Sequence, residues 1–174
     1  QKLPFYFVQI APFRYTPEAE SHALREAQRK TLALEKTGMA VTLDIGEEDD
    51  IHPANKQDVG KRLARLALAN DYGKSEVLAS GPLYKSQKLF PSYIDLDFDY
   101  VGSGLMAKGA LLGFEIAGSD SVFYPARAKI LDDKVRVSSR KVKNPKRVRY
   151  GWKNYFEATL FNAEGLPASS FQTP

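Results

Sequence analysis

The stretch MAVTLDI, at residues 39–45, is a near-continuous apolar run rich in β-branched side chains. A second run, FYFVQI at residues 5–10, has the same character. Strands that are buried on both faces of a sheet have such sequences, whereas half-exposed strands alternate between apolar and polar residues. Both runs therefore predict buried strands of a largely parallel sheet.

Two helical patterns alternate with these strands. Residues 16–18 (TPE) offer Thr as an N-cap and Pro in the first turn, so we expect the first helix to begin there and to end before Gly38. Asn55 can cap a second helix that ends at residues 70–73 (NDYG). Apolar residues repeat at helical spacing in both segments. The order strand–helix–strand–helix predicts parallel strands with helices packed against them.

The sequence after residue 75 changes character. Residues 94–100 alternate strictly between apolar or aromatic side chains and aspartates, and no helical period appears after residue 73. Asp132 and Asp133 can form a hairpin turn. Further strand candidates are residues 111–117, 122–130, 134–139 and 148–150. We therefore divide the chain into an α/β part at residues 1–75 and an antiparallel, β-sandwich-like module at residues 76–174.

The charge pattern bears on the class of partner. The net charge is +4, and eight Lys and Arg residues lie between residues 134 and 149 with no acid among them. They alternate with valines, as on the solvated face of a strand, and a nucleic-acid binder would also need stacking aromatics or a known reader fold. No apolar run reaches the roughly 20 residues of a membrane helix. We therefore predict neither a nucleic-acid nor a membrane partner.

Candidate catalytic residues lie in DIGEEDDIHP, residues 44–53, which follows a predicted buried strand and precedes a helix. Active sites of open α/β sheets form beyond the carboxyl ends of the strands. A serine hydroxyl needs an imidazole to take its proton, and a carboxylate can orient that imidazole. His52, with Asp49 or Asp50, has the residue types for this role. A solvated acidic loop with a structural histidine is the alternative.

Several segments in one order along the chain carry a family resemblance. They are residues 24–28 (LREAQ), 38–46 (GMAVTLDIG), 50–56 (DIHPANK), 80–84 (SGPLY), 113–118 (GFEIAG), 148–152 (VRYGW), 160–162 (LFN) and 165–169 (GLPAS). In these segments the chain resembles sialate O-acetylesterase and its bacterial relatives, which belong to the SGNH-hydrolase superfamily. The resemblance covers nearly the whole chain.

The resemblance implies a fold and a site. Residues 1–75 would be the C-terminal part of a flavodoxin-like, three-layer α/β esterase domain, followed by the antiparallel β-module. His52 would be the catalytic base. The superfamily usually places its Asp three residues before the His, which is Asp49, whereas the Asp-Ile-His-Pro text of the acetylesterase branch points to Asp50. The enzyme would be secreted or periplasmic and would remove O-acetyl groups from sialic acids or plant glycans, without metal or cofactor.

The chain also departs from the family. The Gly-Gln-Ser nucleophile motif and the oxyanion-hole Gly and Asn are absent, and Ser103 between two glycines is interpreted as a loop residue in the β-module. We therefore expect the chain alone to be inactive, and to pair with a missing N-terminal part or to self-associate. The alternative function is a non-catalytic carbohydrate-binding or interaction module. Its stacking residues would be Tyr124, Tyr150, Trp152, Tyr155 and Phe156, which otherwise are expected in the sheet core.

Overall fold

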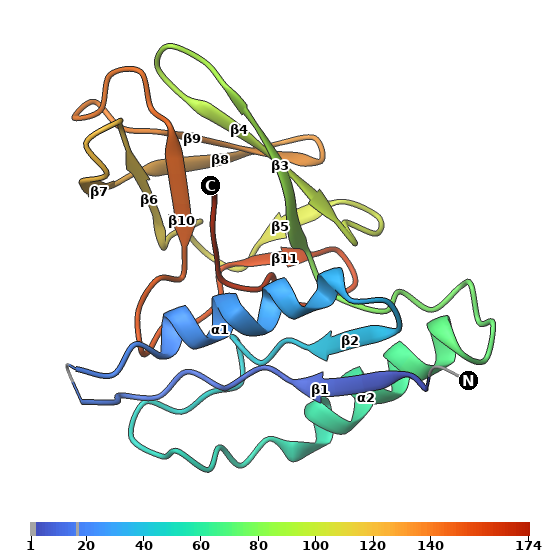
Figure 1. The fold of residues 1–174 in the computed structure, drawn as a ribbon. Helices are drawn as coiled ribbons and strands as arrows, with labels where there is room; N and C mark the ends of the chain where they lie inside the picture. Colours follow the sequence, from blue (N-terminus) through green and yellow to red (C-terminus); the bar gives the residue numbers. More distant parts are fainter. Residues whose placement is uncertain (1–2, 17) are drawn as a thin grey trace.

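A computed structural model describes residues 3–16 and 18–174 of the chain (Figure 1). The α/β part contains β1 (Phe5–Val8), α1 (Ser21–Lys30), β2 (Thr37–Ala40) and α2 (Lys56–Asn70), with a 3-10 turn, η1 (Thr31–Ala33), after α1. β1 and β2 pair in parallel, as the sequence pattern predicts. In Figure 1 the two helices lie on opposite sides of this strand pair.

The two helices differ in how well local sequence predicts their first residue. α2 begins where expected, since Asn55 Oδ1 accepts a hydrogen bond from Asp58 N at 3.1 Å. The expected start of α1 at residues 16–18 is wrong, and Pro17 itself lies outside the described residues. α1 begins at Ser21, whose backbone N donates to Asn154 Oδ1 at 3.0 Å. The cap of α1 is thus a side chain from the other end of the sequence.

The rest of the chain forms antiparallel sheets. One four-stranded sheet has the order β3-β4-β9-β8, a second has the order β12-β10-β6-β7, and β5 pairs with β11. The strands are β3 (Leu83–Leu89), β4 (Ile94–Asp99), β5 (Leu105–Ala107), β6 (Phe114–Ala117), β7 (Phe123–Pro125), β8 (Arg127–Leu131), β9 (Lys134–Ser138), β10 (Arg147–Tyr150), β11 (Leu160–Asn162) and β12 (Phe171–Gln172). The single strand expected at residues 122–130 is wrong, because it divides at Ala126 and its halves join different sheets.

The core lies between the two larger sheets. Leu96 of β4 and Val135 of β9 are fully buried on one side, and Ile116 of β6 and Val148 of β10 are fully buried on the other. Each such side chain contributes roughly 1.5–3 kcal/mol by leaving water. The hairpin turn predicted at residues 132–133 is confirmed between β8 and β9, where Asp132 has a φ of 53°.

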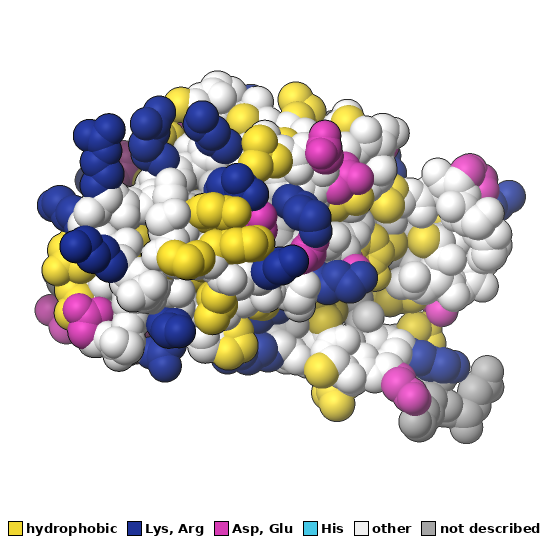
Figure 2. Space-filling view, turned by 90° about the horizontal axis from the view of Figure 1, so that it is seen from above, with side chains coloured by type: hydrophobic (Ala, Val, Ile, Leu, Met, Phe, Trp, Pro, Cys, Tyr) yellow, Lys and Arg dark blue, Asp and Glu magenta, His cyan; other side chains and the backbone are white. Residues whose placement is uncertain are grey.

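The basic run at residues 134–149 pairs with acids of neighbouring strands. The Arg136 guanidinium contacts both carboxylate oxygens of Asp95 at 2.8 and 2.9 Å, and Lys134 contacts Asp97. Arg149 pairs with Glu115 at 2.6 Å. In the view of Figure 2, Lys and Arg side chains are interspersed with acidic and apolar ones. The acidic strand β4 is therefore paired with β9, the first strand of the basic run, whereas Arg149 of β10 has its partner in the other sheet.

Arg25 joins the α/β part to the β-module. It lies in α1 and is fully buried. Its guanidinium donates to Ser170 Oγ at 3.2 Å, to the carbonyl oxygen of Gly151 at 3.4 Å and to that of Lys153. Within the described residues no carboxylate forms an ion pair with it. Burial lowers the pKa of Arg25 to about 10, so it remains charged at neutral pH.

The outer edge of β1 is open to solvent. Backbone groups alternate sides along a strand, and Phe5 N and Gln9 N donate toward the β2 side. The backbone groups of the residues in between face away from β2. On that outer side the Gln28 side chain accepts a hydrogen bond from Ile10 N at 2.9 Å and donates one to Val8 O at 3.3 Å. Among the described residues no strand pairs with this edge. Phe5 beside it is 61% exposed.

We expect this edge to bind another strand, because unpaired backbone groups beside apolar side chains favour strand addition. The chain should self-associate, or pair with a strand from outside it. Size-exclusion chromatography with light scattering tests the first outcome. Amide exchange tests the edge directly: in any monomer, the Tyr6 and Val8 amides should exchange much faster than that of Phe7. A monomer in which all three amides are equally protected would contradict this expectation.

Candidate active site

The loop that carries the predicted site residues starts where β2 ends, and a buried ion pair fixes its base. Both carboxylate oxygens of Asp44 accept from the Arg62 guanidinium at 2.7 Å, and Arg62 also donates to Val41 O at 2.6 Å. Arg62 comes from α2 and is 8% exposed. Bidentate, charge-assisted pairs of this kind fix orientation as well as distance. The start of the loop is therefore held in a fixed position by α2.

A second loop, which follows β1, packs against the first. A Cβ on Gly46 would lie 2.3 Å from Pro12 O, so only glycine allows this close approach. Arg14 N donates to Glu48 O at 2.9 Å, and its guanidinium contacts the carboxylates of Glu48 and Asp49, each at 2.9 Å. Since β1 and β2 are parallel, both loops extend from the same edge of the sheet. The predicted site therefore lies at the carboxyl ends of the strands.

His52 is exposed on this loop. Its backbone N donates to Asp50 Oδ1 at 2.7 Å, and Ala54 N donates to Glu47 Oε1 at 2.6 Å. These two bonds shape the turn that presents the imidazole. Within residues 3–16 and 18–174 the imidazole itself has no hydrogen-bond partner. It is available for a hydrogen bond with a group from outside these residues.

The structure gives the two candidate acids different contacts. The Asp49 carboxylate faces Arg14, and its side chain is 78% exposed. The Asp50 carboxylate accepts the backbone N–H of His52. Neither forms a hydrogen bond with the imidazole. Catalytic hydrogen bonds are often long in a free enzyme and tighten only when substrate binds, so these contacts leave both orienting roles open.

The β-module contributes a wall beside the loop. Ala158 N donates to Leu43 O at 3.2 Å, and Phe13 N donates to Asn154 O at 3.4 Å. Tyr155 lies between these contacts in the sequence and is half-buried. Burial raises the pKa of Tyr155, and the nearby charges of Glu157, Glu48 and Asp49 raise it further. Tyr155 is thus close to the acids that precede His52.

The other predicted aromatic residues divide between core and surface. Tyr150 is fully buried, and its hydroxyl oxygen accepts from Thr159 N and Leu160 N, both at 2.9 Å. Phe156 packs against the same core. Trp152 remains half-exposed, and its ring lies 5.0 Å from that of His22 in α1. His22 is therefore partly covered.

Ser103 has a structural role in a loop of the β-module. Its backbone N and its Oγ both donate to Glu164 Oε1, at 2.9 and 2.7 Å. These bonds lower the pKa of the Glu164 carboxyl. Across the described part of the chain, no serine hydroxyl forms a hydrogen bond with an imidazole. There is likewise no cluster there of three or more His, Cys, Asp or Glu side chains that could bind a metal ion.

Sequence reasoning missed two residues around the loop, Arg14 and Arg62, and it named Tyr155 only as a stacking candidate of the alternative binding module. Arg14 follows the first predicted strand, so the rule for parallel sheets places it at the same edge as His52. Arg62 lies on the predicted helix after the loop, but nothing local in the sequence pairs it with Asp44. Tyr155 reaches the site only through the packing of the β-module.

No helix of the described residues is long and apolar enough to span a membrane.

Comparisons with known proteins bear on the chain as a whole. No protein-family model matches it, and no curated protein matches it. Among solved structures, it is similar to the crystal structure of a carbohydrate acetylesterase from Xanthomonas citri. The identity is 44% and the TM-score 0.92, over 98% of this chain.

The matched region is only part of that enzyme. The chain spans 41% of the length of the Xanthomonas protein. At this identity the likeness extends to sequence as well as fold. The comparison relates the chain, over nearly all of its length, to a part of a carbohydrate acetylesterase.

Proposed function

We propose that the chain is the C-terminal portion of a serine carbohydrate esterase that removes O-acetyl groups from sugars. The observation that carries this proposal is the 44% identity to a carbohydrate acetylesterase over 98% of the chain. The position of His52 beyond the carboxyl ends of two parallel strands supports it. The chain would supply the acid–base end of the site, while the serine and the oxyanion hole come from a part that precedes it.

The proposed reaction is acyl transfer in two steps. The His52 imidazole takes the proton of the serine hydroxyl while that oxygen attacks the acetyl carbonyl, and then gives the proton to the departing sugar oxygen. Water next attacks the acetyl-serine with the same imidazole as base, and acetate and the free serine result. Asp49 or Asp50 would stabilise the imidazolium. No step needs a metal or an organic cofactor.

The substrate proposal is an acetylated glycan, with sialic acids and plant polysaccharides as the two candidate classes. Tyr155, at the edge of the loop, would offer its ring to the sugar. An enzyme that acts on such glycans would be secreted or periplasmic. The open edge of β1 would be covered by a strand of the preceding part, which would extend residues 1–75 into the full three-layer SGNH sheet.

His52→Ala, made in the protein that includes the preceding part, should lower kcat/KM for p-nitrophenyl acetate on the order of 10³-fold or more, because triad residues act as a unit. His22→Ala is the matched control, since it removes the other histidine and should alter thermal stability more than turnover. Activity of His52→Ala within a few-fold of wild type would remove His52 from the site.

Residues 1–174 alone should show no hydrolysis of p-nitrophenyl acetate above buffer. A proton acceptor without a nucleophile or oxyanion hole gives little rate enhancement. Release of p-nitrophenol measures this directly. Turnover by the purified chain that His52→Ala abolishes would place the nucleophile within residues 1–174 and overturn the proposed division.

Asp49→Asn and Asp50→Asn should have unequal effects in the same longer protein. Replacement of the acid that orients the imidazole should lower kcat on the order of 10²-fold or more, since Asn favours the wrong tautomer of the imidazole. The other should change kcat only a few-fold. Glu48→Gln is the control, because Glu48 shares Arg14 with Asp49. Equal, small effects of both Asn variants would place the third triad member elsewhere.

A further inference from the structure

Charges are compensated unevenly across the sheet with the order β3-β4-β9-β8. The aspartates of β4 lie beside β9, where Asp95 binds Arg136 and Asp97 binds Lys134. β8 is at the edge of this sheet, and among the described strands β9 is its one neighbour there. No acidic strand therefore lies beside β8.

β8 places two cations on the outer face of this edge. Arg127 and Lys129 are exposed, whereas Ala128 between them packs against the core. Since side chains alternate between the two faces of a strand, both cations share one face. In the register of the sheet, Arg127 lies opposite Ser138 and Lys129 opposite Arg136. Neither position opposite carries an acid, so the positive charge of β8 is not compensated across the strand pair.

Arg140 adds a third cation next to Arg127. It follows β9, is exposed, and lines two adjoining hollows together with Ser138 and Ser139. The larger hollow, of about 550 Å³, is also lined by Arg127, and the smaller, of about 320 Å³, by Arg136. No acidic side chain of the described residues lines either hollow.

The guanidinium groups of Arg127 and Arg140 are available to a ligand. Within residues 3–16 and 18–174, neither group forms an ion pair or a hydrogen bond. A guanidinium presents a planar fork of N–H donors that matches the two oxygens of a carboxylate. Two such forks beside hollows without acids favour an anionic ligand.

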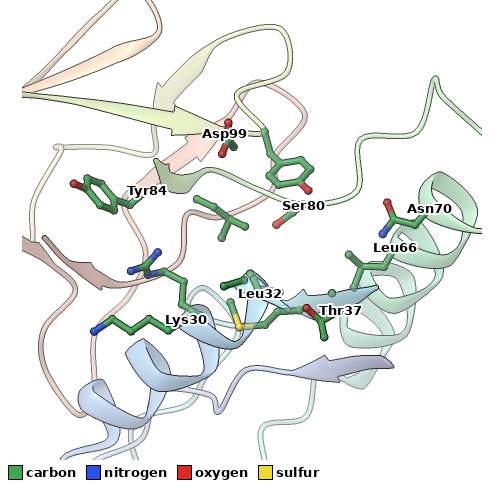
Figure 3. A pocket seen from close by; sticks show the side chains of 14 residues that line it. Lys30, Leu32, Thr37, Leu66, Asn70, Ser80, Tyr84 and Asp99 are labelled. Carbon is green, nitrogen blue, oxygen red and sulfur yellow. The ribbon is translucent and has the colours of Figure 1, made fainter. Parts of the chain in front are cut away.

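The cavity shown in Figure 3 differs, because charges of both signs line it. It lies between the α/β part and the β-module and has a volume of about 390 Å³. Lys30 lies on one side of it and Asp99 on the other. An anion in this cavity would meet Asp99 as well as cations, whereas beside β8 the charged groups that it meets are all cations.

The aromatic ring of the smaller hollow is already in contact with other groups. The Arg136 guanidinium lies 3.8 Å from the centroid of the Tyr93 ring, and the Phe90 ring stacks on it at 4.4 Å. Proteins that bind single-stranded nucleic acids combine a positive groove with aromatic rings on which bases stack. Because the Tyr93 ring is engaged, the hollows favour an anion that is recognised by its charge over a stacked base.

We propose that the basic surface formed by Arg127, Lys129 and Arg140 binds the carboxylates of an acidic sugar chain. The carboxylate of one ring would accept hydrogen bonds from Arg127, and that of a neighbouring ring from Arg140. The charges fix the sign of the ligand, whereas the choice of a sugar rests on the proposed function.

This inference deepens the proposed function by naming an acidic glycan as the substrate class. Both classes considered there, sialic acids and plant polysaccharides, include chains with a carboxylate on every ring. The basic surface would hold such a chain at the β-module, while the loop of His52 acts on an acetyl group.

The test is calorimetric titration of residues 1–174, at low salt, with hexagalacturonate and with a sialic acid hexamer. At least one should bind, and added salt should weaken the binding because exposed charges are screened. The double variant Arg127→Gln/Arg140→Gln should weaken it about tenfold or more, since hydrogen bonds between charged groups are lost. Its melting temperature should not fall, because both side chains are exposed and unpaired.

The matched control is Lys74→Gln/Lys108→Gln, which removes the same charge from exposed cations that line neither hollow. It should leave the affinity nearly unchanged. Binding of hexagalacturonate alone would support a plant polyuronate as the ligand, and binding of the sialic acid hexamer alone would support a sialic acid chain.

Four results would overturn the inference: binding of neither acidic sugar, equal affinity of wild type and the arginine variant, equally tight binding of neutral cellohexaose, or tighter binding of an oligothymidylate, which would indicate a nucleic-acid site. Hydrolysis of acetylated glycans by the longer protein without such binding would refute this inference alone. Binding that the arginine variant loses, without hydrolysis by the longer protein, would refute the esterase alone.

Discussion

The structure depends on one buried cation, Arg25, which has no acid partner among the described residues. Arg25 donates only to hydroxyl and carbonyl oxygens, most of them in the segment from Gly151 to Ser170. Because removal of an ionised guanidinium from water is costly, this segment must stay in contact with α1 to satisfy it. The contact brings Asn154 to the start of α1 and Tyr155 to the loop of His52. The β-module is therefore part of the site's support.

Other polar contacts fix the shape of the candidate site itself. The loops after β1 and β2 are joined by Arg14, and the Asp44–Arg62 pair fixes their base, so the shape of the loop does not depend on a substrate. The imidazole of His52 has no hydrogen-bond partner in the described residues. Under the proposed function, both the sheet and the triad would be completed by residues of the preceding part.

Local sequence predicted the features that depend on neighbouring residues. The parallel pair β1–β2, the cap at Asn55 and the turn at Asp132 follow from short patterns. The strand predicted at residues 39–45 pairs with β1 only as far as Ala40, because Leu43 instead bonds to Ala158. Arg25 and the start of α1 were missed since their partners lie more than a hundred residues away. His52 is predicted from its position after a strand, and sequence spacing does not choose between Asp49 and Asp50 as the orienting acid.

The most direct test of the central claim is covalent labelling with a fluorophosphonate, followed by mass spectrometry of the protein that includes the preceding part. The account predicts a single labelled serine before residue 1, with labelling greatly slowed by His52→Ala because the imidazole activates that hydroxyl. A labelled serine within residues 1–174, such as Ser103, or labelling that is independent of His52, would contradict it.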